Sequence, residues 1–114
     1  MKNMVNKIRV ESKSDFVLLE DENIKMFADN KEYSFDVSDI WRVLIITTDQ
    51  GPLYDDMCLV VEVGKETAIF VMSEHLSYET FLFEQLGKIL KLDYNEIIQA
   101  SMSTDNKIFV IYEK

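Results

Sequence analysis

The stretch Trp41-Arg42-Val43-Leu44-Ile45-Ile46-Thr47-Thr48 is rich in β-branched residues and contains the longest fully apolar run of the chain. Its apolar residues occupy both alternating sets of positions, so both faces of an extended segment would be apolar. This pattern is typical of a strand in the interior of a sheet. The sequence Asp49-Gln50-Gly51-Pro52 then breaks the strand. We therefore expect residues 41–48 to form a central strand.

Shorter strands are predicted on both sides of this segment. Upstream, alternating apolar positions are separated by charged turns at residues 20–23 and 28–31. Downstream, Gly64-Lys65 is suited to a two-residue hairpin turn. The expected flanking strands are residues 7–10, 15–20, 24–27, 33–37, 57–63, 67–72 and 107–112.

The apolar period changes from that of strands to that of helices after residue 72. Ser77 is suited to capping a helix, and Glu79 to its first turn. The apolar face expected for this helix consists of Leu82, Leu86, Ile89 and Leu90. Asp93 is expected to cap a second, shorter helix whose apolar side carries Ile97 and Ile98.

Together these elements predict an α+β fold: one domain over residues 1–114, with a mostly antiparallel sheet of about six to seven strands, a C-terminal helical segment and a final strand. The N-terminus is basic but lacks the apolar core of a signal peptide, and no apolar run approaches the roughly 20 residues that span a bilayer. The single cysteine, Cys58, cannot form an internal disulfide. We expect a cytoplasmic protein.

The negative charge of the chain is concentrated in one half. Residues 11–62 carry 13 acids and four bases, a balance of −9, which equals the net charge of the whole chain. An acidic domain repels polyanions and attracts basic proteins. The charge therefore argues against binding to nucleic acid and to anionic membranes.

The sequence offers little catalytic or metal-binding equipment. His75 is the only histidine, and its neighbours Ser73, Glu74 and Ser77 are typical of a helix entry, so a surface position in a loop is favoured. Cys58 lies in an apolar strand, downstream of two acids that would raise its pKa, and is interpreted as a core or near-core thiol. No zinc, calcium or phosphate-binding pattern is present, and no cofactor is expected.

A recognition surface remains as the preferred kind of functional site. The segment 47–56 combines a strand-breaking sequence, two apolar residues and three acids, a composition suited to binding a basic partner. The alternative is that Leu53 and Tyr54 pack under the sheet while the acids face water. Trp41 is expected in the core rather than at an interface. The candidate partner-binding residues are Asp49, Tyr54, Asp55 and Asp56, supported by Asp36 and Asp39.

The region from Ile40 to Tyr112 resembles a group of small uncharacterised bacterial proteins. The shared features are a strand ending in Gly-Pro, an acidic pair, an apolar hairpin, a helix, an L-D-Y-N-like helix entry and a final strand, at residues 41–48, 51–52, 55–56, 57–72, 78–90, 92–95 and 108–112. The resemblance implies a compact domain with a pleckstrin-homology-like sheet and C-terminal helix. It implies no established activity.

Three functions follow as hypotheses. The first is a non-catalytic binding domain for a basic protein in the bacterial cytosol, in its most concrete form an immunity-type inhibitor of a basic toxin. The second is a small-ligand or peptide-binding module whose pocket between sheet and helix is lined by Tyr33, Phe35, Phe81 or Phe83. The third is an enzyme built on the acids and His75. The sequence leaves open whether the protein is a monomer or a dimer.

Overall fold

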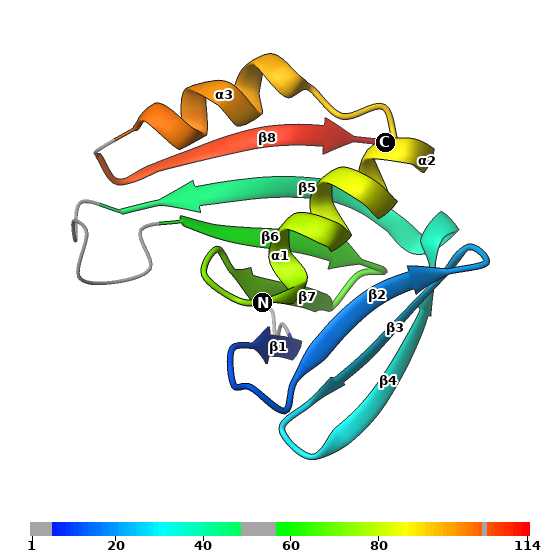
Figure 1. Cartoon of the computed structure of the whole chain (residues 1–114). Coiled ribbons are helices and arrows are strands. Elements are labelled where there is room, and N and C mark those ends of the chain that lie inside the picture. The colour runs from blue at the N-terminus through cyan, green and yellow to red at the C-terminus, as the bar shows by residue number, and fades with distance from the viewer. Residues whose placement is uncertain (1–5, 49–56, 104) are drawn as a thin grey trace.

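The predicted α+β class is confirmed, but the strands divide between two sheets. The computed structural model describes residues 6–48, 57–103 and 105–114. Within these residues, a five-stranded mixed sheet and a three-stranded antiparallel sheet enclose a helix (Figure 1). The expected six to seven strands are therefore eight, and a large hydrophobic core joins both sheets.

The five-stranded sheet is built around the apolar segment that the sequence marks as central. Its β5 strand (Ile40–Thr47) pairs on both sides with antiparallel neighbours, which confirms the prediction for this segment. One pairing, between the first strand and β7, is parallel. In spatial order the sheet consists of β1 (Asn6–Val10), β7 (Thr67–Met72), β6 (Met57–Val63), β5 and β8 (Lys107–Glu113).

The three-stranded sheet is a meander joined by two very tight turns. It contains β2 (Phe16–Glu20), β3 (Asn23–Ala28) and β4 (Lys31–Asp36). The two residues of each turn have positive φ: 51° at Asp21, 68° at Glu22, 54° at Asp29 and 61° at Asn30. This is the geometry of type I′ hairpins, whose twist matches that of the flanking strands.

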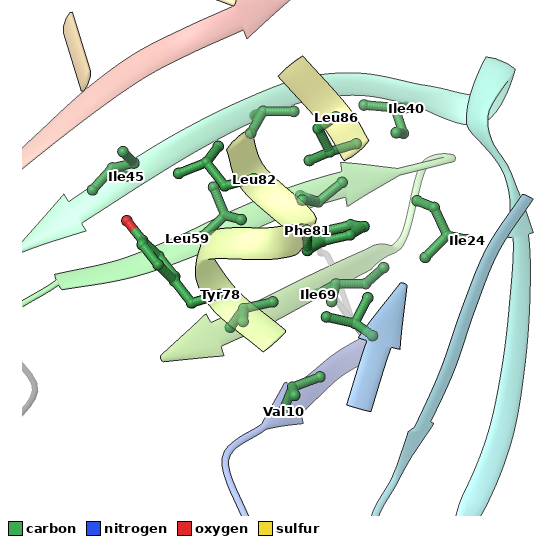
Figure 2. Close-up of a cluster of buried hydrophobic side chains, with 14 of the residues drawn as sticks. Val10, Ile24, Ile40, Ile45, Leu59, Ile69, Tyr78, Phe81, Leu82 and Leu86 are labelled. Atoms are coloured by element: carbon green, nitrogen blue, oxygen red, sulfur yellow. The ribbon is translucent and has the colours of Figure 1, made fainter. Parts of the chain in front are cut away.

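A central helix, residues 77–89, lies between the two sheets. It comprises α1 (Ser77–Glu79), the π-helical η2 (Thr80–Leu86) and α2 (Gly87–Ile89). Figure 2 shows Tyr78, Phe81, Leu82 and Leu86 directed into the core, and the last three are fully buried. Around them lie Val10, Ile24, Ile40, Ile45, Leu59 and Ile69.

The expected buried face of this helix is correct for Leu82 and Leu86 and wrong for Ile89, which is 47% exposed. The i→i+5 hydrogen bonds of a π-helix widen the turn, so side chains after it no longer follow the 3.6-residue period. Ile89 is thereby rotated out of the core.

Two side chains of the central helix satisfy the free edge of β2. The Val17 N–H donates to Ser77 Oγ (3.4 Å), and the Leu19 N–H donates to Gln85 Oε1 (2.7 Å). The expected capping role of Ser77 is therefore wrong, because Leu76 occupies the cap position. The Ser77 hydroxyl instead accepts a hydrogen bond from the three-stranded sheet. Unpaired strand edges are otherwise exposed to association with other chains.

The C-terminal elements extend the five-stranded sheet, where α3 packs against β8 and β5. Asp93 caps α3 (Tyr94–Met102) by accepting from the Glu96 N–H (3.1 Å), as predicted. Ile97 is buried, but Ile98 is 55% exposed, so only one of the two expected core residues is correct. The short 3₁₀ helix η1 (Val37–Asp39) joins the two sheets.

Trp41 is not in the core, contrary to expectation. A bulge between Ile40 and Arg42 interrupts the pairing of β5 with β6. Ile40 is buried, whereas Trp41 is exposed. The Arg42 guanidinium carbon lies over the Trp41 ring, 4.8 Å from the ring centroid. The extra residue of a bulge redirects a side chain, and no sequence period reveals this.

Glu22 is expected to limit stability, because a side chain with Cβ in the left-handed region costs roughly 1–2 kcal/mol. Replacing Glu22 by Gly should stabilise the fold by about 0.5–1 kcal/mol after the entropic cost of glycine is included. Urea unfolding measures this difference. Glu22→Gln removes the same charge but keeps Cβ, so it should leave stability unchanged; an equal gain in both variants would contradict the backbone explanation.

Gln85→Leu should destabilise the fold by about 1–3 kcal/mol, because the Leu19 N–H loses its acceptor at a half-buried edge. Gln85→Glu retains an acceptor oxygen and should retain most of the stability. The two variants are compared by thermal unfolding. Equal losses would show that packing of the side chain, rather than its hydrogen bond, matters.

Candidate functional site

The predicted recognition residues fall into two groups. Asp49, Tyr54, Asp55 and Asp56 lie outside the described residues, so their placement stays a prediction. Asp36 and Asp39 are described, and both are exposed. Asp36 ends β4 and caps η1, whereas the backbone carbonyl of Asp39 accepts from the Gly64 N–H (2.9 Å) in the β6–β7 turn.

Asp36 belongs to a larger surface, the outer face of the three-stranded sheet. The strand register places its side chains in three rows across β2, β3 and β4. We call this surface the acidic face. Its rows are Phe16–Phe27–Glu32, Leu18–Lys25–Ser34 and Glu20–Asn23–Asp36.

The acidic face combines an apolar shelf with carboxylates. Phe16, 41% exposed, stacks on Phe27 with ring centroids 6.3 Å apart. An open cavity of about 410 Å³ lies here, with Phe16, Leu18 and Glu32 among its lining residues. An aromatic face beside a carboxylate is suited to a cation, which gains from both the ring quadrupole and the opposite charge.

Local hydrogen bonds keep the carboxylates of this surface ionised. The Lys25 ammonium donates to Glu20 Oε1 (2.6 Å), which lowers the pKa of Glu20 and raises the pKa of Lys25. The Ser38 N–H donates to Asp36 Oδ1 (2.8 Å) and lowers the pKa of Asp36. Glu20, Glu32 and Asp36 are the three acids of this face and Lys25 is its one base, so its formal charge is −2.

Sequence reasoning missed the rows of the acidic face but identified both turns that create them. Each turn contains two residues, and a two-residue turn fixes which strand residues lie opposite one another. Pairing outward from Asp21-Glu22 and from Asp29-Asn30 brings Phe16, Phe27 and Glu32 together.

His75 lies at the entry of the central helix, as the favoured interpretation proposed. The Ser77 N–H donates to His75 Nδ1 (3.0 Å), so the ring proton is assigned to Nε2, which donates to the Ser12 carbonyl (2.8 Å). The imidazole thus caps a helix and holds the loop after β1. Both ring nitrogens serve the fold, so the enzyme hypothesis gains no support from this residue.

The loop that His75 contacts is organised by Asp15. Oδ2 of Asp15 accepts from the N–H groups of Ser12 (2.9 Å) and Glu11 (3.1 Å). Burial acts to raise the pKa of Asp15, but these two hydrogen bonds, with hydrogen bonding from the Ser12 side chain, outweigh it and lower the pKa. The ionised carboxylate therefore stabilises the connection between the two sheets.

The remaining candidates for chemistry are weaker. Cys58 is half-buried on β6, with Sγ 3.6 Å from the Leu59 carbonyl. Within the described ranges, no cluster of three His, Cys, Asp or Glu residues could hold a metal ion. No helix in the same ranges is long and apolar enough to cross a membrane.

The aromatic residues proposed for a ligand pocket do not meet in one place. Phe81 is fully buried in the core. Phe83 borders a separate hollow with Tyr78 and Ile97. Tyr33 and Phe35 stack with centroids 6.3 Å apart and line a cavity of about 420 Å³ beside β1, away from the helix. Of the four residues, Phe83 lines a hollow of about 310 Å³ between sheet and helix, whereas Tyr33 and Phe35 line a groove between the edges of two sheets.

Comparison with known proteins gives no further guidance: no protein-family profile, no curated protein and no solved structure matches the chain.

Asp15→Asn should destabilise the protein at neutral pH by about 1–2 kcal/mol, because its amide replaces a charge-assisted acceptor. The pKa of Asp15 is lower in the folded state, so its contribution is complete above the ordinary value of about 3.9 and is lost as the pH falls through the folded value. Melting temperatures of the two proteins should therefore converge in acid. A difference independent of pH would contradict this explanation.

Proposed function

We propose that this chain is a non-catalytic binding domain for a basic protein, and that the acidic face is its docking surface. The observation that carries the proposal is the three-row arrangement, in which an exposed phenylalanine shelf lies among ionised carboxylates. A partner can bury an apolar or arginine side chain on this shelf, while the surrounding acids attract and orient its basic surface.

The overall charge supports the same partner class. The chain carries −9, and acids outnumber bases over residues 11–62, which include all three strands of the acidic face. Such a field raises the association rate with a basic partner and is weakened by salt. Asp49, Tyr54, Asp55 and Asp56 remain candidate contributors.

The most concrete form of this proposal is an immunity-type inhibitor of the bacterial cytosol. Such a protein neutralises a basic toxin by covering its active site with an acidic surface. A small domain with a strongly negative charge and a rigid sheet face fits this task, because a preorganised surface loses little entropy on binding.

The test uses the chain as bait in lysate of its native host at low and moderate salt. Glu20→Lys with Glu32→Lys reverses two charges of the acidic face, and Glu66→Lys with Glu84→Lys makes the same change, from −9 to −5, elsewhere. We expect the wild type and the control variant to retain a basic protein that salt releases. The acidic-face variant should retain at least tenfold less of that protein. Equal retention by both variants would refute the assignment of this face.

A specific observation favours a second candidate. The groove beside β1, lined by Tyr33 and Phe35, offers an aromatic wall and two unpaired sheet edges to a small ligand or an extended peptide. If folded wild-type bait retains no protein, this groove becomes the preferred site, and a ligand that raises the melting temperature identifies its class.

A further inference from the structure

The five-stranded sheet has a second apolar face, on the side opposite the central helix. In β5 to β8, side chains on the inner face enter the main core. On the opposite, outer face, residues of β5, β6 and β7 form a separate small cluster. Figure 1 shows the central helix against the inner face. The apolar residues that the register places on the outer face are Leu44, Ile46, Cys58, Val60, Ala68, Phe70, Met72, Ile108 and Val110.

This face lacks the polar character of a solvated sheet surface. An antiparallel sheet with one side in water normally alternates apolar and polar residues. The acidic face follows that rule in part, with six of its nine positions polar or charged. On the outer face of the five-stranded sheet, Leu44, Val60 and Ala68 are buried among their neighbours, whereas Ile108 and Val110 on β8 are 65% and 39% exposed. Contiguous apolar patches of this kind mark association surfaces.

The charge of this face is opposite to that of the chain. Its charged strand residues are three bases, Lys7, Arg9 and Arg42, and two acids, Glu62 and Glu113, a balance of +1. Arg42 pairs with Glu62 at 2.5 Å, and the Arg9 guanidinium lies 5.5 Å from the centroid of Phe70. A basic partner is therefore unsuited to this surface, which separates it from the acidic face.

We propose that the occupant is a second copy of this chain, packed outer face against outer face as a two-fold dimer. Two flat apolar sheets pack face to face at about 10 Å with interdigitating side chains. Elsewhere two copies that each carry −9 repel one another, whereas here Arg42 of each copy can approach Glu62 or Glu113 of the other. A two-fold axis provides such contacts in reciprocal pairs.

The available area suits a modest, reversible dimer. Five strands spaced by about 4.8 Å and about six residues of about 3.3 Å each give a plan area of roughly 500 Å². A standard interface buries about 800 Å² of accessible surface from each partner, and side-chain relief adds to the plan area. The dimer leaves the acidic face of each copy outside the interface, so it is independent of the proposed function.

Sedimentation equilibrium of the purified chain, from micromolar to millimolar concentration, tests the dimer. Ile108→Lys places a charge on the outer face and should raise the dimer dissociation constant at least tenfold. Ile98→Lys makes the same change at an exposed isoleucine of α3 and should leave it unchanged. Added salt should strengthen the dimer by screening the mutual repulsion, the reverse of its effect on a basic partner.

Cys58 provides a second readout, because the single cysteine of the chain lies on this face. Its rate of reaction with a thiol reagent should fall as the protein concentration of wild type rises, and should not fall for Ile108→Lys. A wild type that remains monomeric throughout, or a dimer weakened by Ile98→Lys and not by Ile108→Lys, would overturn the proposal. Thermal unfolding of both variants confirms that each is folded.

Discussion

The architecture depends on one constraint: the three-stranded sheet has to be attached to the central helix. Phe81, Leu82 and Leu86 fill the space between the two sheets, and burying each side chain contributes about 1.5–3 kcal/mol of transfer free energy. Apolar burial alone does not fix how the three-stranded sheet is placed along the helix. Ser77 and Gln85 fix this placement, because they accept hydrogen bonds from the edge of β2.

This arrangement determines which surfaces remain for recognition. The helix uses the inner face of each sheet, so each sheet keeps one outer face for other molecules (Figure 1). The two outer faces differ in chemistry. One carries carboxylates around a phenylalanine shelf, and the other is apolar with a slight positive balance. Two surfaces of such different character are suited to two different partners.

Much of the fold follows from short-range sequence patterns, and most of the errors concern irregular geometry. The strands, both hairpin turns and the Asp93 cap were predictable because each depends on residues close in sequence. Ile89 and Trp41 were misplaced, since a π-helical turn and a β-bulge shift the side-chain period without a sequence signal. Of the candidate site, only Asp36 and Asp39 are described. The acidic face was recoverable from turn length, whereas the groove beside β1 arises from contacts between distant segments.

The apolar character of β5 on both faces has a wider meaning than its central position in the sheet. A strand inside a domain becomes apolar on both sides when two layers cover it, but the described chain supplies only one layer here. The strands β6, β7 and β8 also carry apolar residues on both faces, so this is a property of the sheet and not of one strand. In the proposed dimer a second copy would supply this layer, and the acidic face of each copy, which belongs to the other sheet, would stay outside the interface. Two docking surfaces in one assembly would then bind a basic partner with the added strength of bivalency, wherever the partner can reach both.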